Sequence, residues 1–83
     1  MEITLKLYAG LSQYLPDNSE KNSTKLTVTS SETAFSILEK FNVPKESAHL
    51  ILLNGVYLET DEREKSSFKE GDTLAVWPPV AGG

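Results

Sequence analysis

A single stretch of this chain shows helical periodicity, and segments with strand patterns lie on both sides of it. Its apolar face consists of Ala34, Ile37, Leu38 and Phe41. Thr33 is a good N-cap, Asn42 stands where a left-handed C-terminal cap is expected, and Pro44 prevents continuation. A helix of about two turns is not stable in isolation, so it must pack on a sheet. This requirement constrains the fold more than any other feature of the sequence.

The strand patterns precede and follow the helix. They cover residues 2–8 and 25–29 before it, and 50–53, 56–58 and 73–77 after it. The first segment alternates, with Ile3, Leu5 and Leu7 on one face. Asn54-Gly55 is typical of a tight hairpin turn because both residues tolerate positive φ. We expect polar residues 16–24 to form a connection, with one helical turn before it at 11–15.

This element order predicts the α+β class. One mixed sheet of four to five strands, covered by one main helix, buries every apolar face. The arrangement fits the ubiquitin-like β-grasp fold. With 83 residues, one domain is expected. We divide the chain into a β-grasp domain over residues 1–77 and an extended tail over residues 78–83.

Composition excludes several kinds of site. The absence of cysteine rules out disulfides, iron–sulfur ligation and thiolate zinc sites, and His49 is the sole histidine. Twelve acidic and eight basic residues disfavour a nucleic-acid partner, which needs a basic patch. The mixed charges of residues 59–65 indicate a solvated face, and we expect no metal site. We expect neither a secretory signal nor a membrane span, and a cytoplasmic location is the default.

The tail has its own physical character. Pro78 and Pro79 cannot donate ladder hydrogen bonds, so strand pairing should stop there and the chain should become stiff and extended. Val80, Ala81 and then Gly82-Gly83 follow, with decreasing side-chain bulk. Glycine permits close approach of enclosing walls, so a slim tip suits delivery of a terminal carboxylate into another protein. Activating a carboxylate as an acyl adenylate requires ATP, magnesium and a shaped site, which this chain does not supply.

Several segments carry a resemblance to a known family. They are Leu7-Tyr8-Ala9-Gly10-Leu11, Val43-Pro44, Leu53-Asn54-Gly55, Glu70-Gly71-Asp72 and the segment from Trp77 to Gly83. The chain resembles the small subunit of molybdopterin synthase and the other MoaD/ThiS sulfur carriers. The aromatic-Pro-Pro-Val-X-Gly-Gly ending is the most specific element. The chain departs from the family at Ser12-Gln13, where Arg-Glu is frequent.

The resemblance implies a carrier without an active site or tightly bound cofactor of its own. An E1-like enzyme would adenylate Gly83 with ATP and magnesium, and a sulfur donor protein would convert it to a thiocarboxylate. The large subunit of molybdopterin synthase would then receive the tail and use the sulfur to build molybdopterin. Two alternatives stay open: a sulfur carrier for thiamine or tRNA thiolation, and a ubiquitin-like modifier or adaptor that carries no sulfur.

Two aromatic residues are candidates for partner binding. Parity places Trp77 opposite the Leu74/Val76 face of its strand, and Tyr8 opposite Ile3, Leu5 and Leu7. Both therefore belong to the outer face of the sheet, where they would form a docking patch to which Leu58 is also assigned. The alternative is that the two rings cover the back of the sheet and pack on each other.

Overall fold

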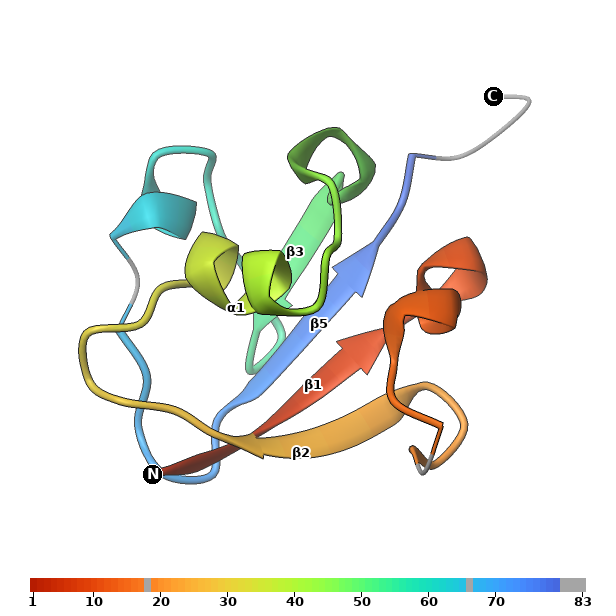
Figure 1. Ribbon diagram of the computed structural model, residues 1–83. Coiled ribbons are helices and arrows are strands. Elements are labelled where there is room, and N and C mark those ends of the chain that lie inside the picture. Colours follow the sequence, from red (N-terminus) through yellow and green to blue (C-terminus); the bar gives the residue numbers. More distant parts are fainter. Residues whose placement is uncertain (18, 66, 80–83) are drawn as a thin grey trace.

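The computed structural model describes residues 1–17, 19–65 and 67–79, and in these ranges a mixed sheet carries one main helix on one face (Figure 1). The strands are β1 (Glu2–Leu7), β2 (Ser23–Thr27), β3 (Leu50–Leu53), β4 (Val56–Tyr57) and β5 (Thr73–Trp77). The main helix is α1 (Ala34–Lys40), and the short 3-10 helices are η1 (Ala9–Tyr14), η2 (Lys45–Ser47) and η3 (Glu62–Glu64).

The five strands lie in the order β2-β1-β5-β3-β4. β1 and β5 are parallel, and the other neighbouring strands pair antiparallel. The carboxyl ends of β1 and β5 therefore lie side by side, with η1 next to them (Figure 1). This topology confirms the predicted ubiquitin-like β-grasp fold of the α+β class, with a five-stranded mixed sheet and one main helix.

The core lies between the sheet and α1. Alternate residues of β1 and β5 face the helix, and Leu5 and Leu74, which are paired in register, are both fully buried. The other core side chains include Ile3, Leu7, Leu11, Val28, Ala34, Ile37, Leu38, Val43, Ile51, Leu58, Phe68 and Val76. Because α1 is only 7 residues long, burial of its apolar face rather than intrinsic propensity stabilises it.

Local signals place the turns as the sequence predicts. Thr33 Oγ1 accepts a hydrogen bond from the Ser36 amide, while Ser36 Oγ accepts one from the Thr33 amide, which forms a reciprocal capping box. Asn42 has φ of 64° after the helix, and Asn54 and Gly55 have φ of 52° and 83° in the β3–β4 hairpin. These positive values explain why asparagine and glycine stand there.

The second strand begins earlier than its alternation suggests. Instead of covering residues 25–29, β2 spans Ser23–Thr27, because Ser23 pairs with Lys6 and Thr24 with Leu5. The polar connection predicted over residues 16–24 is shorter by two residues at its end. The predicted helical turn at 11–15 is a 3-10 helix that starts at Ala9. Pairing with β1 decides where β2 begins, and the polar side chains of Ser23 and Thr24 hide this start from a search for alternating apolar residues.

No helix in the described ranges has both the length and the apolar character that crossing a bilayer requires.

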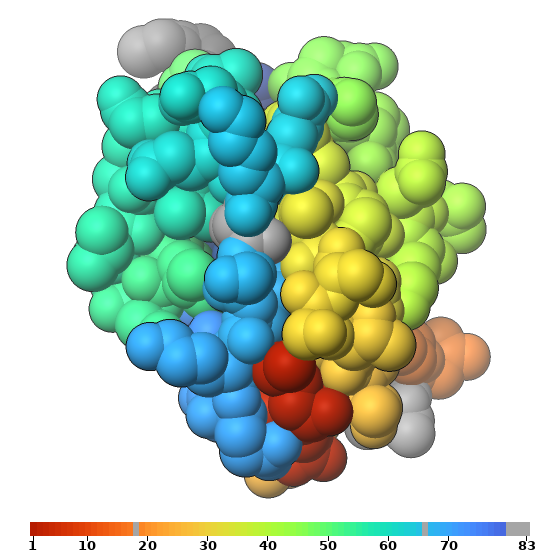
Figure 2. Space-filling model, turned by 90° about the vertical axis from the view of Figure 1, so that its left-hand side faces the viewer, coloured from red at the N-terminus to blue at the C-terminus, as the bar shows by residue number. Residues whose placement is uncertain are grey.

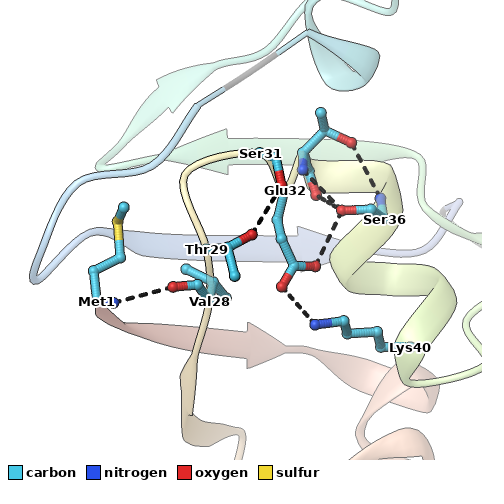
Figure 3. Close-up of polar contacts among 8 residues, drawn as sticks. Met1, Val28, Thr29, Ser31, Glu32, Ser36 and Lys40 are labelled. Carbon is cyan, nitrogen blue, oxygen red and sulfur yellow. Dashed lines mark hydrogen bonds and ion pairs between the residues drawn. The ribbon is translucent and has the colours of Figure 1, made fainter.

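A polar cluster joins the amino end of the chain to the start of α1 (Figure 3). The Met1 amino group donates to the Val28 carbonyl oxygen at 3.0 Å. The Glu32 carboxylate forms an ion pair with Lys40 and also accepts a hydrogen bond from Ser36 Oγ at 3.4 Å (Figure 3). The hydrogen bond from Lys40 holds the pKa of Glu32 below its ordinary value of 4.5.

Replacing Glu32 with glutamine should produce a stability loss that depends on pH. Because the folded-state pKa of Glu32 is lowered, its ion pair stabilises the fold above pH 4.5, and this contribution disappears as the pH falls through the folded-state pKa. Urea unfolding of wild type and Glu32→Gln should therefore differ at pH 7 and converge under strongly acidic conditions. Glu39→Gln serves as a control, because Glu39 is an exposed residue of α1, the helix that Glu32 precedes. A Glu32→Gln loss that is constant from pH 7 to pH 2 would contradict this account.

Candidate functional site

The candidate site is the point where the chain leaves the centre of the sheet after β5. Two backbone hydrogen bonds hold this exit. The His49 amide donates to the Trp77 carbonyl oxygen at 3.0 Å, and the Tyr8 amide donates to the Val76 carbonyl oxygen at 3.1 Å. The end of β5 is thus attached on one side to the segment before β3 and on the other to the segment after β1. Pro78 and Pro79 follow directly.

The two aromatic residues predicted for the outer face stack on each other. Their ring centroids are 4.4 Å apart, with an angle of 6° between the ring planes, and both Tyr8 and Trp77 are half-buried. The packing of the two rings on each other, which the alternative described, is thereby observed. Such a stack contributes about 0.5–1.5 kcal/mol beyond its area burial. Its role in docking a partner stays a prediction.

An apolar groove with a volume of about 620 Å³ surrounds the exit. Its walls are Ala9, Gly10, His49, Leu50, Trp77, Pro78 and Pro79. One wall comes from the start of η1, the other from the start of β3, and the floor from the end of β5. Three segments that are far apart in sequence therefore meet where the tail begins, because β1 pairs parallel with β5 and β3 pairs antiparallel with it.

Leu58 does not belong to the outer face, so its assignment to the docking patch is wrong. Its side chain is 7% exposed and lies in the core. Its amide donates to the carbonyl oxygen of Ile51, a core residue that is fully buried. In this register Leu58 shares the inner face with Ile51. The β4 residue on the outer face is instead Tyr57, which pairs with Leu52 and is 45% exposed.

Arg63 is a residue that the sequence analysis missed. It lies in the charged segment 59–65, which was predicted to be solvated, yet it is only 6% exposed. Its Nε donates to the Leu58 carbonyl oxygen at 3.0 Å, Nη1 to that of Ala48 at 3.2 Å, and Nη2 to that of His49 at 3.0 Å. A lone arginine among carboxylates gave no sequence signal for this burial. Figure 2 shows the segment, in cyan, packed beside the yellow chain that leads into the helix.

Within residues 1–17, 19–65 and 67–79, no three or more His, Cys, Asp or Glu side chains are arranged to hold a metal ion. The His49 side chain is exposed beside the groove. The arrangement can present an apolar surface to another protein. Of the predicted tail residues, Pro78 and Pro79 are among the residues that the structure describes. The others lie outside the described ranges: Val80, Ala81, Gly82 and Gly83.

A family model described as Mut7-C ubiquitin matches residues 1–82 of the chain. The chain belongs to the Mut7-C ubiquitin family. Among curated proteins, none matches this member of the family. The match over nearly the whole length agrees with the ubiquitin-like fold. The predicted resemblance to the small subunit of molybdopterin synthase is confirmed at the level of the fold by the molybdopterin-converting factor structures.

Solved structures share the fold of this Mut7-C ubiquitin protein at low sequence identity. SAMP1 from Haloferax volcanii is 21% identical over 100% of both chains, with a TM-score of 0.68. A chain in the complex of subunits 1 and 2 of molybdopterin-converting factor from Helicobacter pylori is 19% identical over 100% of both chains, with a TM-score of 0.61. A putative subunit 1 of that factor from Pyrococcus furiosus is 16% identical, covering 95% of this chain and 98% of its own, with a TM-score of 0.64.

Proposed function

We propose that this protein is a sulfur carrier whose working group is the carboxylate of Gly83. The observation that supports this proposal most strongly is the way the chain leaves the centre of the sheet after β5. Trp77 is held by His49 and stacked on Tyr8, and the Pro78-Pro79 step follows directly. In the sequence, Val80-Ala81-Gly82-Gly83 comes next. A stiff step on a rigid base, followed by residues of decreasing bulk, suits insertion of the chain end into an enzyme.

The chemistry takes place in partner proteins. In an E1-like enzyme the Gly83 carboxylate attacks the α-phosphate of ATP, pyrophosphate leaves, and an acyl adenylate forms, with magnesium bound to the phosphates. A sulfide sulfur then attacks the acyl carbon, the bond to AMP breaks, and a thiocarboxylate remains. This chain contributes the acyl group and a docking surface. It holds no nucleotide or metal of its own in this scheme.

The acceptor that we propose is a pterin precursor bound to the large subunit of molybdopterin synthase. The complex of subunits 1 and 2 of the Helicobacter pylori factor, which shares the fold, supports a large-subunit partner. SAMP1, which also shares the fold, keeps the modifier alternative open. Carriers for thiamine or tRNA thiolation would use the same loaded end. We propose that the groove around Trp77 and Pro78, together with the Tyr8–Trp77 stack, is the docking surface in each case.

The test is the intact mass of the protein after incubation with ATP, magnesium, sulfide and a purified activating enzyme. A gain equal to the exchange of one oxygen for one sulfur is expected, and it should be absent when ATP is omitted. Adding the large subunit with a pterin precursor should then reverse the gain. If several competent activating enzymes produce no gain, the sulfur-carrier proposal is wrong. Covalent conjugates to other proteins without sulfur gain would indicate a modifier.

A further inference from the structure

Arg63 is a buried cation whose described partners include no carboxylate. The ion pairs in the described ranges join Lys40 to Glu32 and Lys45 to Glu64, and neither involves Arg63. Arginine is rarely this buried unless it is paired, so its donors must be satisfied in another way. Each of its three nitrogen atoms has a partner: four hydrogen bonds go to backbone carbonyl groups and to the Tyr57 hydroxyl, which lies 3.3 Å from Nη2.

Two of the carbonyl partners of Arg63 lie beside the point where the chain leaves β5. Ala48 and His49 are the two residues before β3, and Arg63 binds the carbonyl oxygens of both. The amide of His49 donates in the opposite direction, to the carbonyl oxygen of Trp77. The peptide segment at His49 therefore connects the guanidinium on one side with the last residue of β5 on the other.

The planar guanidinium is suited to this task. Its Nε reaches the Leu58 carbonyl oxygen after β4, while Nη1 and Nη2 reach the two carbonyl oxygens before β3. A lysine ammonium has its donors on one atom and cannot span the same set of acceptors in fixed directions. The ring of Tyr57 lies 5.5 Å from the Arg63 Cζ and adds a further contact with the cation.

We propose that Arg63 is a positioning residue for tail presentation: by fixing the His49 backbone, it sets the wall of the exit groove and the direction in which the chain leaves Trp77. The effect of Arg63 on tail presentation rests on the proposed carrier function. Its effect on the His49 backbone does not depend on that function. Arg63 is not among the residues that line the groove, and it acts through His49, which is.

The first measurement is amide hydrogen exchange of His49 in wild type, Arg63→Met and Arg63→Lys. Val28→Ala is the matched control, since Val28 is buried next to Met1, at the opposite end of β1 from the groove. At equal global stability, adjusted with urea, Arg63→Met should speed exchange of the His49 amide on the order of tenfold over the control. The exchange rate of the His49 amide in Arg63→Lys should lie between those of the wild type and Arg63→Met. If Arg63→Met does not fold, the rate in Arg63→Lys decides whether Arg63 fixes the His49 backbone.

The second measurement is the loading kinetics with whichever activating enzyme loads the wild type. The KM for the carrier should rise on the order of tenfold in Arg63→Met, while kcat changes by less than about twofold, because docking rather than chemistry is impaired. Val28→Ala should leave both constants unchanged. His49 exchange equal to that of the control, or an equal KM change in Val28→Ala, would overturn the proposal. If no enzyme loads the wild type, the carrier function fails, and the exchange result still decides the role of Arg63.

Discussion

Deletion of Gly83 is expected to abolish sulfur loading while the domain stays folded. The deletion withdraws the carboxylate by about 3.3–3.6 Å along an extended chain. A misplacement of even 1 Å at a reacting centre costs up to about a hundredfold in rate, so the shortened tail should fall below detection. Intact mass after the loading reaction measures the effect, and the thermal midpoint of unfolding should equal that of the wild type.

A length-matched variant controls this experiment. Ala81→Gly keeps the number of residues and removes one methyl group, so it should load at close to the wild-type rate. If the chain without Gly83 is loaded as fast as the wild type, the position of the terminal carboxylate does not matter and the carrier mechanism is contradicted. An adaptor that binds through its sheet would retain its function in a strain that carries only the shortened chain, whereas a carrier would lose it.

Leu74→Ala is expected to cause a large loss of stability. Leu74 is 0% exposed and lies in register between Leu5 of β1 and Leu53 of β3, at the centre of the sheet. A buried leucine-to-alanine change costs about 2–5 kcal/mol through lost burial and the cavity left behind. The total stability of a domain of this length is about 4–12 kcal/mol, so the change should remove a large share of it.

Urea unfolding of Leu74→Ala measures this loss, and Thr73→Ala is the neighbouring control. Thr73 is half-buried on the opposite face of β5, so its replacement should cost no more than about 1 kcal/mol. A Leu74→Ala midpoint equal to that of Thr73→Ala would show that the helix-facing side of β5 is not the centre of the core.

Features that depend on a few consecutive residues were predictable from sequence. The alternation in residues 2–8, the cap at Thr33, and the Asn54-Gly55 turn each express a local preference, and together they predicted the element order and the β-grasp class. Parity also identified Tyr8 and Trp77 as outward-facing aromatics. Parity did not identify Leu58 as a core residue, because its position depends on its register with Ile51. A two-residue strand such as β4 is too short for its sequence pattern to predict that register.

The amino-acid sequence by itself determined the order of strands and helix, because that order follows from short-range periodicity. It also determined the positions of the turns and the end of the last strand before Pro78, because these follow from the backbone limits of proline, glycine and asparagine. Only the tertiary structure decided which carbonyl groups stay outside the β-ladder before β3, and hence why Arg63 is buried among them. It also decided that Tyr8, His49 and Trp77 meet at one exit. These contacts join residues far apart in the chain, so no local pattern specifies them.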